Sequence, residues 1–172
     1  CEIIFQNDKG YGDALIKGLN SVETRYFCIF NADGSFNPKE LENMISKIEK
    51  NDDNLDIIFA SRYEKNSSSE DDTYLTWFGN KIFSLIGNIF FKLSISDILY
   101  TFVLGKTLKC KNLNLKKKDF RFCVELPIKA KRANLKLGII NSHERKRIAG
   151  KKKVNEFKDG SVILFYLLRL FF

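Results

Sequence analysis

The sequence predicts an α/β fold in which a mostly parallel sheet is flanked by helices. The first observation behind this prediction is that apolar runs of strand length alternate with longer segments in which apolar residues recur at helical spacing. Strand, helix and strand in this order are typical of βαβ units with right-handed crossovers. The second observation is that the 172 residues are 44% hydrophobic and include only two prolines, which suits one filled core and excludes a disordered chain.

Local signals indicate the elements of the first third of the chain. An apolar run at residues 2–6 is predicted to be a strand that ends in a turn, and a helix with one apolar face begins at Tyr11. Residues 26–30 are all apolar or aromatic, as expected for a strand that is buried on both faces of a sheet. The next helix is specified by a capping residue at Asn37, by Pro38 in its first turn and by an apolar stripe.

Further elements are expected beyond residue 50. They are a strand at 56–60, a polar loop at 64–73, a long helix at 77–93, extended segments at 97–104 and 108–115, a helix at 124–132 and a strand at 137–140. The long helix has one narrow polar stripe, so most of its surface is apolar.

The last residues form an apolar tail with one arginine. We expect a domain at 1–160 followed by this tail at 161–172, which is shorter than the roughly 20 apolar residues that span a bilayer. Three alternatives stay open for it. It packs on the core, lies as a helix in a membrane interface, or begins a membrane segment.

Charge is distributed unevenly along the chain. The net charge is +8, but residues 1–86 carry 9 Lys/Arg against 15 Asp/Glu, whereas residues 87–172 carry 20 against 6. A basic half of this kind favours an anionic partner, which can be a nucleic acid, a phosphorylated ligand or an acidic lipid headgroup.

Cysteine and histidine usage excludes several kinds of site. The four cysteines, Cys1, Cys28, Cys110 and Cys123, form no CxxC pair, and His143 is the one histidine of the sequence. A disulfide scaffold, a thiolate zinc site and a histidine-based metal site are therefore not expected, and a reducing compartment fits better.

The clearest candidate site follows the strand at 26–30, where the sequence reads Asn31-Ala32-Asp33. Ligands of open α/β sheets bind outside the carboxyl ends of strands. A carboxylate there can hold Mg²⁺ or Mn²⁺, because such ions keep most of their coordination for water and substrate phosphates. The alternative is that Asp33-Gly34-Ser35 only makes a turn that leads to the cap at Asn37.

Two other segments could bind phosphate. Gly10 and Gly12 open a helix, although the third glycine of a dinucleotide motif is missing. The segment 144–153 is a basic loop that contains Arg145 and Arg147, whose planar side chains suit phosphate. A solvated charge run and a nucleic-acid patch are the alternatives. The loop contains no aromatic residue on which a base could stack, so nucleic acid is not expected as a partner.

Taken in order, these motifs resemble the family-2 glycosyltransferases of the GT-A fold, and among them the polyprenyl- and dolichyl-phosphate sugar transferases. The matching segments are Gly10-Tyr11-Gly12-Asp13-Ala14 with Gly18, Asn31-Ala32-Asp33-Gly34-Ser35, Ser61-Arg62-Tyr63, Asn80, Asp97, Glu125-Leu126, and Arg147, Gly150 and Lys153. They cover nearly the whole chain. Asn31 stands where the family has the first Asp of its D-x-D element, and Tyr100-Thr101-Phe102 stands where it has S-G-F/Y.

The resemblance implies roles for individual residues. Asp33 would be the ligand of Mg²⁺ or Mn²⁺, with Ser35 as a further candidate ligand. Asp97 would be the base if the acceptor were a sugar hydroxyl. The residues placed on the donor and its phosphates are Gly10, Gly12, Asn31, Asp33, Arg62, Arg145, Arg147 and Lys153.

The resemblance also implies a function. The expected reaction moves a sugar, with inversion, from a nucleotide-diphosphate donor to a polyprenyl-phosphate or a saccharide acceptor, in glycan synthesis at the cytoplasmic face of a membrane. The family's first βαβ unit, which holds the nucleotide base, has no counterpart in these residues, so we expect a longer protein. The alternative is a non-catalytic, basic module derived from such an enzyme that binds a membrane surface.

Overall fold

The computed structural model describes residues 2–6, 8–50, 54–150 and 153–171. Cys1 and two lysines of the basic loop, Lys151 and Lys152, lie outside the described residues. The helices are α1 (Tyr11–Ser21), α2 (Pro38–Glu49), α3 (Tyr74–Phe91), α4 (Thr107–Lys111), α5 (Phe122–Arg132) and α6 (Glu156–Phe171). The strands are β1 (Tyr26–Ile29), β2 (Ile57–Ser61), β3 (Ser68–Ser69), β4 (Val103–Lys106), β5 (Leu137–Asn141) and β6 (His143–Glu144).

The central sheet has the strand order β1-β4-β2-β5. β1, β2 and β5 run in one direction, and β4 runs in the opposite direction between β1 and β2. The predicted α/β fold, a sheet flanked by helices, is therefore confirmed. Its detail differs, because β4 makes two of the three strand pairings antiparallel. A second, two-stranded sheet pairs β3 with β6 beside the end of β2.

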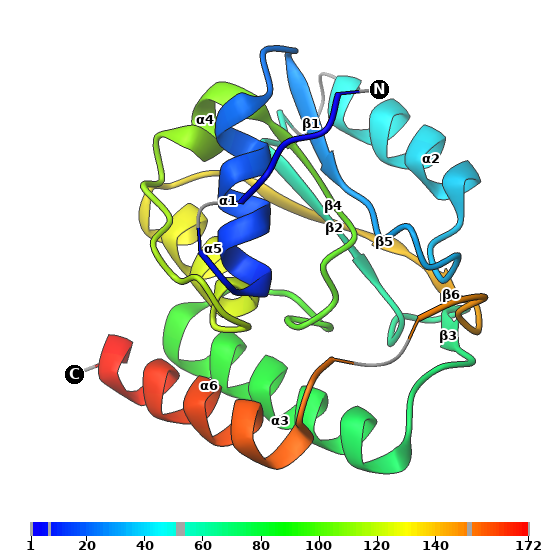
Figure 1. Cartoon of the computed structure of the whole chain (residues 1–172), viewed down its shortest axis with the longest axis vertical. Helices are drawn as coiled ribbons and strands as arrows, with labels where there is room; N and C mark the ends of the chain where they lie inside the picture. Colours follow the sequence, from blue (N-terminus) through cyan, green and yellow to red (C-terminus); the bar gives the residue numbers. More distant parts are fainter. Residues whose placement is uncertain (1, 7, 51–53, 151–152, 172) are drawn as a thin grey trace.

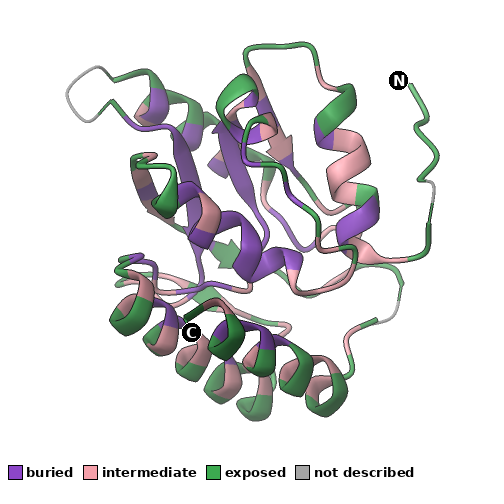
Figure 2. Cartoon of the chain, turned by 90° about the vertical axis from the view of Figure 1, so that its left-hand side faces the viewer, coloured by how far each residue is buried: buried purple, intermediate pink, exposed green. Residues whose placement is uncertain are grey.

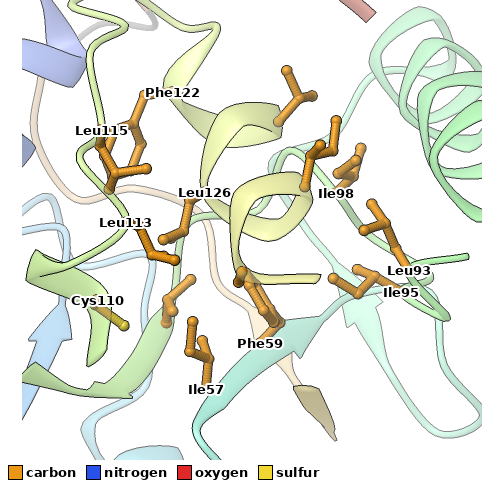
Figure 3. Packing of buried hydrophobic residues seen from close by; sticks show 14 of the residues in the cluster. Ile57, Phe59, Leu93, Ile95, Ile98, Cys110, Leu113, Leu115, Phe122 and Leu126 are labelled. Atoms are coloured by element: carbon orange, nitrogen blue, oxygen red, sulfur yellow. The ribbon is translucent and has the colours of Figure 1, made fainter. Parts of the chain in front are cut away.

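Both faces of the central sheet are covered. In Figure 1, α2 lies on one side of the sheet and α1 and α5 lie on the other. β2 is buried throughout, with Ile57 and Phe59 in the larger core cluster and Ile58 and Ala60 in the smaller one. Figure 3 shows how Phe59 packs in the larger cluster against side chains that follow α3 and side chains of the α5 region. The continuous apolar run of this strand is explained by this two-sided burial.

α3 and α6 lie side by side at one end of the sheet (Figure 1). Ile163, Tyr166 and Leu167 of α6 are buried in the larger core cluster, and the rings of Phe90 and Phe171 lie 4.5 Å apart. Figure 2 shows that the middle of the sheet is buried, whereas much of the surface of these two helices is exposed or half-buried. No helix of the described residues has the length and apolar character needed to cross a membrane.

Two local predictions are wrong, and a third is confirmed only in part. Residues 2–6 form no strand, since they pair with none of the described strands and most of their side chains are exposed. The first residues of the segment 108–115 belong to the helix α4, in which Cys110 is buried in the core. Only the end of the segment 97–104 belongs to β4. The part before it is irregular chain, in which the amides of Ile98 and Leu99 donate to side chains of α3 rather than to a strand.

The other predicted helices and strands are confirmed, with their ends shifted by a few residues. The cap of α2 has the expected geometry, because the side chain of Asn37 accepts a hydrogen bond from the amide of Lys39 at 3.2 Å. The long helix α3 begins earlier than expected, at a second cap, where Thr73 accepts from the amide of Thr76. The loop 64–73 contains the short strand β3.

Candidate active site

A cavity of about 860 Å³ lies between the carboxyl ends of β1 and β2, the basic loop and the helices α3 and α6. Its charged and amide lining residues are Asn31 and Asn80, the acids Asp33, Asp71, Asp72, Glu144, Glu156 and Asp159, and the bases Arg62, Arg147 and Lys153. Its apolar lining comes largely from the two helices and includes Leu75, Ile82, Phe83, Ile163 and Leu164. Charged groups of both signs opposite an apolar wall are suited to a ligand that has a charged part and a hydrophobic part.

Asp33 lies in the turn that follows β1. One oxygen of its carboxylate, Oδ1, accepts hydrogen bonds from the Ser35 amide at 3.0 Å and from the Ser35 hydroxyl at 2.7 Å. Burial works against ionisation, but these hydrogen bonds and the charge of Arg147 lower the pKa of Asp33 below its usual value. The carboxylate is therefore ionised at neutral pH, and its other oxygen, Oδ2, lies 3.9 Å from the Arg147 guanidinium.

Ser35 has a different place from the one expected. Its side chain is 2% exposed, and its hydroxyl donates to Asp33. The hydroxyl therefore holds the Asp33 carboxylate in position through this hydrogen bond, and Ser35 is not among the residues that line the cavity.

The basic loop folds directly over this turn. The amide of Arg145 donates to the Ser35 carbonyl at 2.9 Å, and the amide of Ile148 donates to the Asp33 carbonyl at 2.8 Å. Gly34 has φ of +84°, and a Cβ built there would lie 2.7 Å from the side chain of Ile148. Glycine at this position therefore allows both the turn and the close approach of the loop.

The two predicted arginines of the loop differ in what they contact. The Arg145 guanidinium donates to the Phe36 carbonyl at 2.8 Å, so it fastens the loop to the turn. Arg147 lines the cavity, and its Nε donates to Asp71 at 3.1 Å. This hydrogen bond to Asp71, followed by the charges of Asp71 and Asp33, raises the pKa of Arg147 above its usual value. Lys153 also lines the cavity.

Arg62 is at the centre of a buried network. Its Nε and one terminal nitrogen donate to the two oxygens of Asp97 at 2.7 and 3.0 Å, and its other terminal nitrogen donates to Asp72 at 3.1 Å and to Glu144 at 3.0 Å. The guanidinium also lies 4.5 Å from the ring centre of Tyr100. Burial opposes the charge, but Asp97 and then Glu144 raise the pKa of Arg62 well above its usual value. Each of its three nitrogens is thus already engaged.

Asp97 is fully buried beside this arginine, at 0% exposure, and is not among the residues that line the cavity. Its carboxylate accepts from Arg62, from the backbone amide of the same residue at 3.1 Å, and from the side chain of Asn80. An acceptor in the cavity therefore meets no exposed oxygen of Asp97. In this arrangement Asp97 positions Arg62 and joins the end of β2 to α3.

Gly10 and Gly12 point to protein backbone rather than to the cavity. A Cβ built at Gly10 would lie 2.1 Å from the Lys118 carbonyl oxygen, and one built at Gly12 would lie 2.1 Å from the Lys117 carbonyl oxygen. The amide of Asp13 donates to the same Lys118 carbonyl at 3.0 Å. Carbonyl oxygens thus occupy the place where a phosphate would be expected. The glycines permit close packing of α1 on this segment.

Glu125 also holds the backbone segment that packs against Gly10 and Gly12. Its carboxylate accepts from the amides of Lys116 and Lys117 at 2.9 and 2.7 Å and lies 2.9 Å from the Lys129 ammonium. Between the two glycines, Tyr11 reaches the cavity, and its hydroxyl lies 2.5 Å from the Thr101 hydroxyl. These contacts shape one wall of the cavity through packing.

Five acidic residues that line the cavity are not among the candidates that the sequence indicates, and two of them, Glu156 and Asp159, belong to α6. Asp71 and Asp72 lie in the loop 64–73, which the sequence predicts to be a polar surface segment, and Glu144 is part of the predicted basic loop. The only signal in the sequence is that an acidic loop and a basic loop both follow ends of predicted strands. Among the residues that the structure describes, no three His, Cys, Asp or Glu side chains are grouped so that they could hold a metal ion.

Comparison with known proteins gives a family and a fold. The sequence model of Glycosyl transferase family 2 matches residues 1–112. No curated protein matches the chain by sequence.

Solved structures match over nearly the whole chain. Glucosyl-3-phosphoglycerate synthase from Mycobacterium tuberculosis in complex with uridine-diphosphate is 12% identical with a TM-score of 0.67, and the match covers 94% of this chain and 55% of that one. The same synthase with Mn²⁺, uridine-diphosphate and glucosyl-3-phosphoglycerate is 11% identical with a TM-score of 0.67, covering 94% and 54%. A mycobacterial protein is 11% identical with a TM-score of 0.65, covering 97% and 52%. The chain thus spans about half the length of these proteins, and the likeness is one of fold.

Proposed function

The chain belongs to glycosyl transferase family 2, and on that premise we propose that its site transfers a sugar from a nucleotide-diphosphate donor, with inversion at the anomeric carbon. The observation that carries this proposal is the ionised carboxylate of Asp33 beside Arg147, at the carboxyl end of β1 in the large cavity. A sheet of this kind places its ligand at this edge. Arg147 and Lys153 would contact the diphosphate, because both line the cavity and Arg147 can bind two oxygens at once.

The residues present fit a divalent metal that is shared with the donor. Asp33 offers one ionised carboxylate whose Oδ2 is free of Ser35, and the described residues form no cage of three ligands. Mg²⁺ commonly binds one or two carboxylates together with substrate phosphates and water. Mn²⁺ or Mg²⁺ held by Asp33 and the diphosphate would offset the charge of the leaving group. The synthase of similar fold that was crystallised with Mn²⁺ and uridine-diphosphate supports this proposal.

A polyprenyl phosphate is the acceptor that we favour. In the proposed step an oxygen of the lipid phosphate bonds to the anomeric carbon, and the bond from that carbon to the diphosphate oxygen breaks, so that the nucleoside diphosphate leaves with the electron pair. The attacking oxygen is already anionic at neutral pH and loses no proton, which agrees with the burial of Asp97. Burial raises the pKa of the Cys123 thiol in the cavity to about 12, which disfavours a thiolate nucleophile.

The outer faces of α3 and α6 support a membrane surface as the place of reaction. Large apolar side chains that are exposed on these helices include Tyr74, Trp77, Phe78, Leu85, Ile89, Phe157, Phe165 and Leu168. Helices with a broad apolar face lie in the plane of a membrane interface. The same two helices supply the apolar wall of the cavity, so a lipid acceptor would reach it from that side. We place the reaction at the cytoplasmic face.

The donor site is tested by binding of inorganic pyrophosphate with Mn²⁺, measured by calorimetry on this chain. Pyrophosphate needs only the phosphate and metal contacts, so the probe does not depend on residues that hold a nucleotide base. Asp33→Asn is expected to weaken Mn²⁺-dependent binding by about 100-fold, since a lost charged contact of this kind costs roughly 3 kcal/mol. The matched control is Glu42→Gln on the exposed face of α2, which should bind like the wild type. Equal affinity of Asp33→Asn and the control would remove Asp33 from the site.

The second candidate function is a non-catalytic module that binds a membrane surface. The exposed apolar faces of α3 and α6 and the pairing of Arg62 and Arg147 with carboxylates favour it. Sedimentation with vesicles that contain anionic lipid separates the two functions. Salt-sensitive binding to the vesicles, without any response to pyrophosphate or to a nucleotide sugar with Mn²⁺, would favour the module.

A further inference from the structure

We propose that Asp71 is a displaceable counter-ion that occupies the phosphate-binding face of Arg147 until a diphosphate takes its place. The proposal rests on the donor site described above. Asp71, Arg147 and Asp33 all line the same cavity. Nε of Arg147 donates to Oδ1 and Oδ2 of Asp71 at 3.3 and 3.1 Å, and a terminal nitrogen donates to Oδ2. Two neighbouring donors of the guanidinium thus hold this carboxylate, and the same two donors can bind phosphate oxygens.

Asp71 is held less firmly than its neighbour in the sequence. Asp72 contacts the buried Arg62 at 3.1 Å and the Tyr63 hydroxyl. In the described chain, the side-chain contacts that the structure gives for Asp71 all go to Arg147, and its amide makes a long 3.3 Å hydrogen bond to Ser69. Two adjacent carboxylates thus have different environments. Asp72 is fixed in the buried network, whereas Asp71 can leave its one side-chain partner among the described residues.

The backbone on both sides of Arg147 is fixed to the site. Its loop is tied to the turn after β1 by the Arg145 and Ile148 amides, which donate to the carbonyls of Ser35 and Asp33 at 2.9 and 2.8 Å. When Asp71 leaves, the guanidinium therefore stays within reach of the Asp33 carboxylate, 3.9 Å away. The Arg147 side chain is also only 25% exposed, so water hydrates its charge poorly. The guanidinium therefore needs an anionic partner both with and without a bound ligand.

Exchange of one anion for another has a consequence for selectivity. A ligand gains only the difference between its own contact with Arg147 and the contact that Asp71 gives up. A single weak anion gains little from this exchange. A diphosphate that contacts Arg147 and also binds a cation beside Asp33 gains from both. Asp71 would thus select for ligands that carry two phosphates.

The experiment compares pyrophosphate binding with Mn²⁺ in the wild type, Asp71→Asn and Glu70→Gln. Asp71→Asn is expected to bind about tenfold more tightly than the wild type, which corresponds to roughly 1.4 kcal/mol. Glu70→Gln is the matched control. It removes a charge from the same loop, but the partners of Glu70 are His143 and the Lys146 amide. It should bind like the wild type. Asp71→Ala is a second variant that removes the same charge if the asparagine variant folds poorly.

The double variant Asp71→Asn with Arg147→Ala tests the route of the effect. Because the gain is assigned to release of Arg147, the double variant should bind no more tightly than Arg147→Ala alone. If the wild type binds pyrophosphate and both Asp71 variants bind it equally well or more weakly, the role of Asp71 is overturned. The proposed donor site is not affected by that result. A gain of the same size in Glu70→Gln would overturn the role of Asp71 too, because the effect would then be general charge. Absence of binding in every variant would overturn the donor site together with this inference.

Discussion

The molecule contains two clusters of charged residues, one around Arg62 (the Arg62 centre) and one around Arg147 (the Arg147 centre), that differ in burial. Arg62 and the carboxylates of Asp97, Asp72 and Glu144 are each exposed by 10% or less. Arg147 and its partners Asp71 and Asp33 are exposed by 19–25%. A buried charge that loses its partner has no water to replace it, whereas a half-buried charge can exchange one anion for another. The Arg62 centre is therefore suited to hold elements together, and the Arg147 centre is suited to bind a ligand.

The largest effect is expected at the buried centre. Asp97→Asn keeps the shape of the side chain but leaves Arg62 without its bidentate partner. Breaking a buried ion pair from one side costs roughly 3–5 kcal/mol, so the free energy of unfolding should fall by about that amount. Urea unfolding followed by circular dichroism measures it. A loss below about 1 kcal/mol, the range of exposed ion pairs, would mean that the two centres do not differ as described.

A smaller effect on stability is expected at the open centre. Arg147→Ala removes a partly exposed ion pair, and pairs of that kind contribute about 0–1 kcal/mol. The same variant should lose most of the pyrophosphate binding, since the guanidinium is the proposed phosphate contact. Asp97→Asn should therefore mainly lower the free energy of unfolding, whereas Arg147→Ala should mainly weaken pyrophosphate binding. Equal loss of stability in the two variants would contradict this expectation.

The smallest effect concerns pH. The pKa of Asp33 is lowered in the folded chain, so ionisation of this carboxyl stabilises the fold above the pKa of the unfolded state, about 3.9. This contribution is lost as the pH falls through the lower, folded pKa. The difference in unfolding free energy between the wild type and Asp33→Asn should thus be constant from pH 7 to 5 and shrink below pH about 4. A difference that stays constant down to pH 3 would show that Ser35 and Arg147 do not favour the ionised form.

Local signals in the sequence were sufficient for most helices and for the position of Asp33. The cap at Asn37 and the apolar stripe of α2 depend on residues a few positions apart, and such signals can be read directly. The order of the motifs also placed Arg147 with Asp33, although 114 positions separate them in the sequence. The metal and phosphate roles of these residues stay predictions.

Contacts between segments that are far apart in the sequence cannot be predicted from such local signals. Gly10 and Gly12 predict a phosphate loop, because a glycine pair before a helix has no feature that distinguishes a bound phosphate from a packed carbonyl group. The role of Asp97 was missed for a similar reason. A carboxylate after a helix can face solvent, ligand or arginine, and only the tertiary structure brings Arg62 and Asn80 to it.

The place of β4 between β1 and β2 has a consequence for how the chain folds. β1 and β2 have no pairing with each other, and Cys28 pairs with Leu104 while Ile58 pairs with the same residue from the other side. Until residues 103–106 are synthesised, both earlier strands keep open edges that can join other chains. Closing the sheet requires a contact across more than 70 positions, which slows folding. A chain cut before β4 would therefore be prone to aggregate, even though it would contain Asp33 and Arg62.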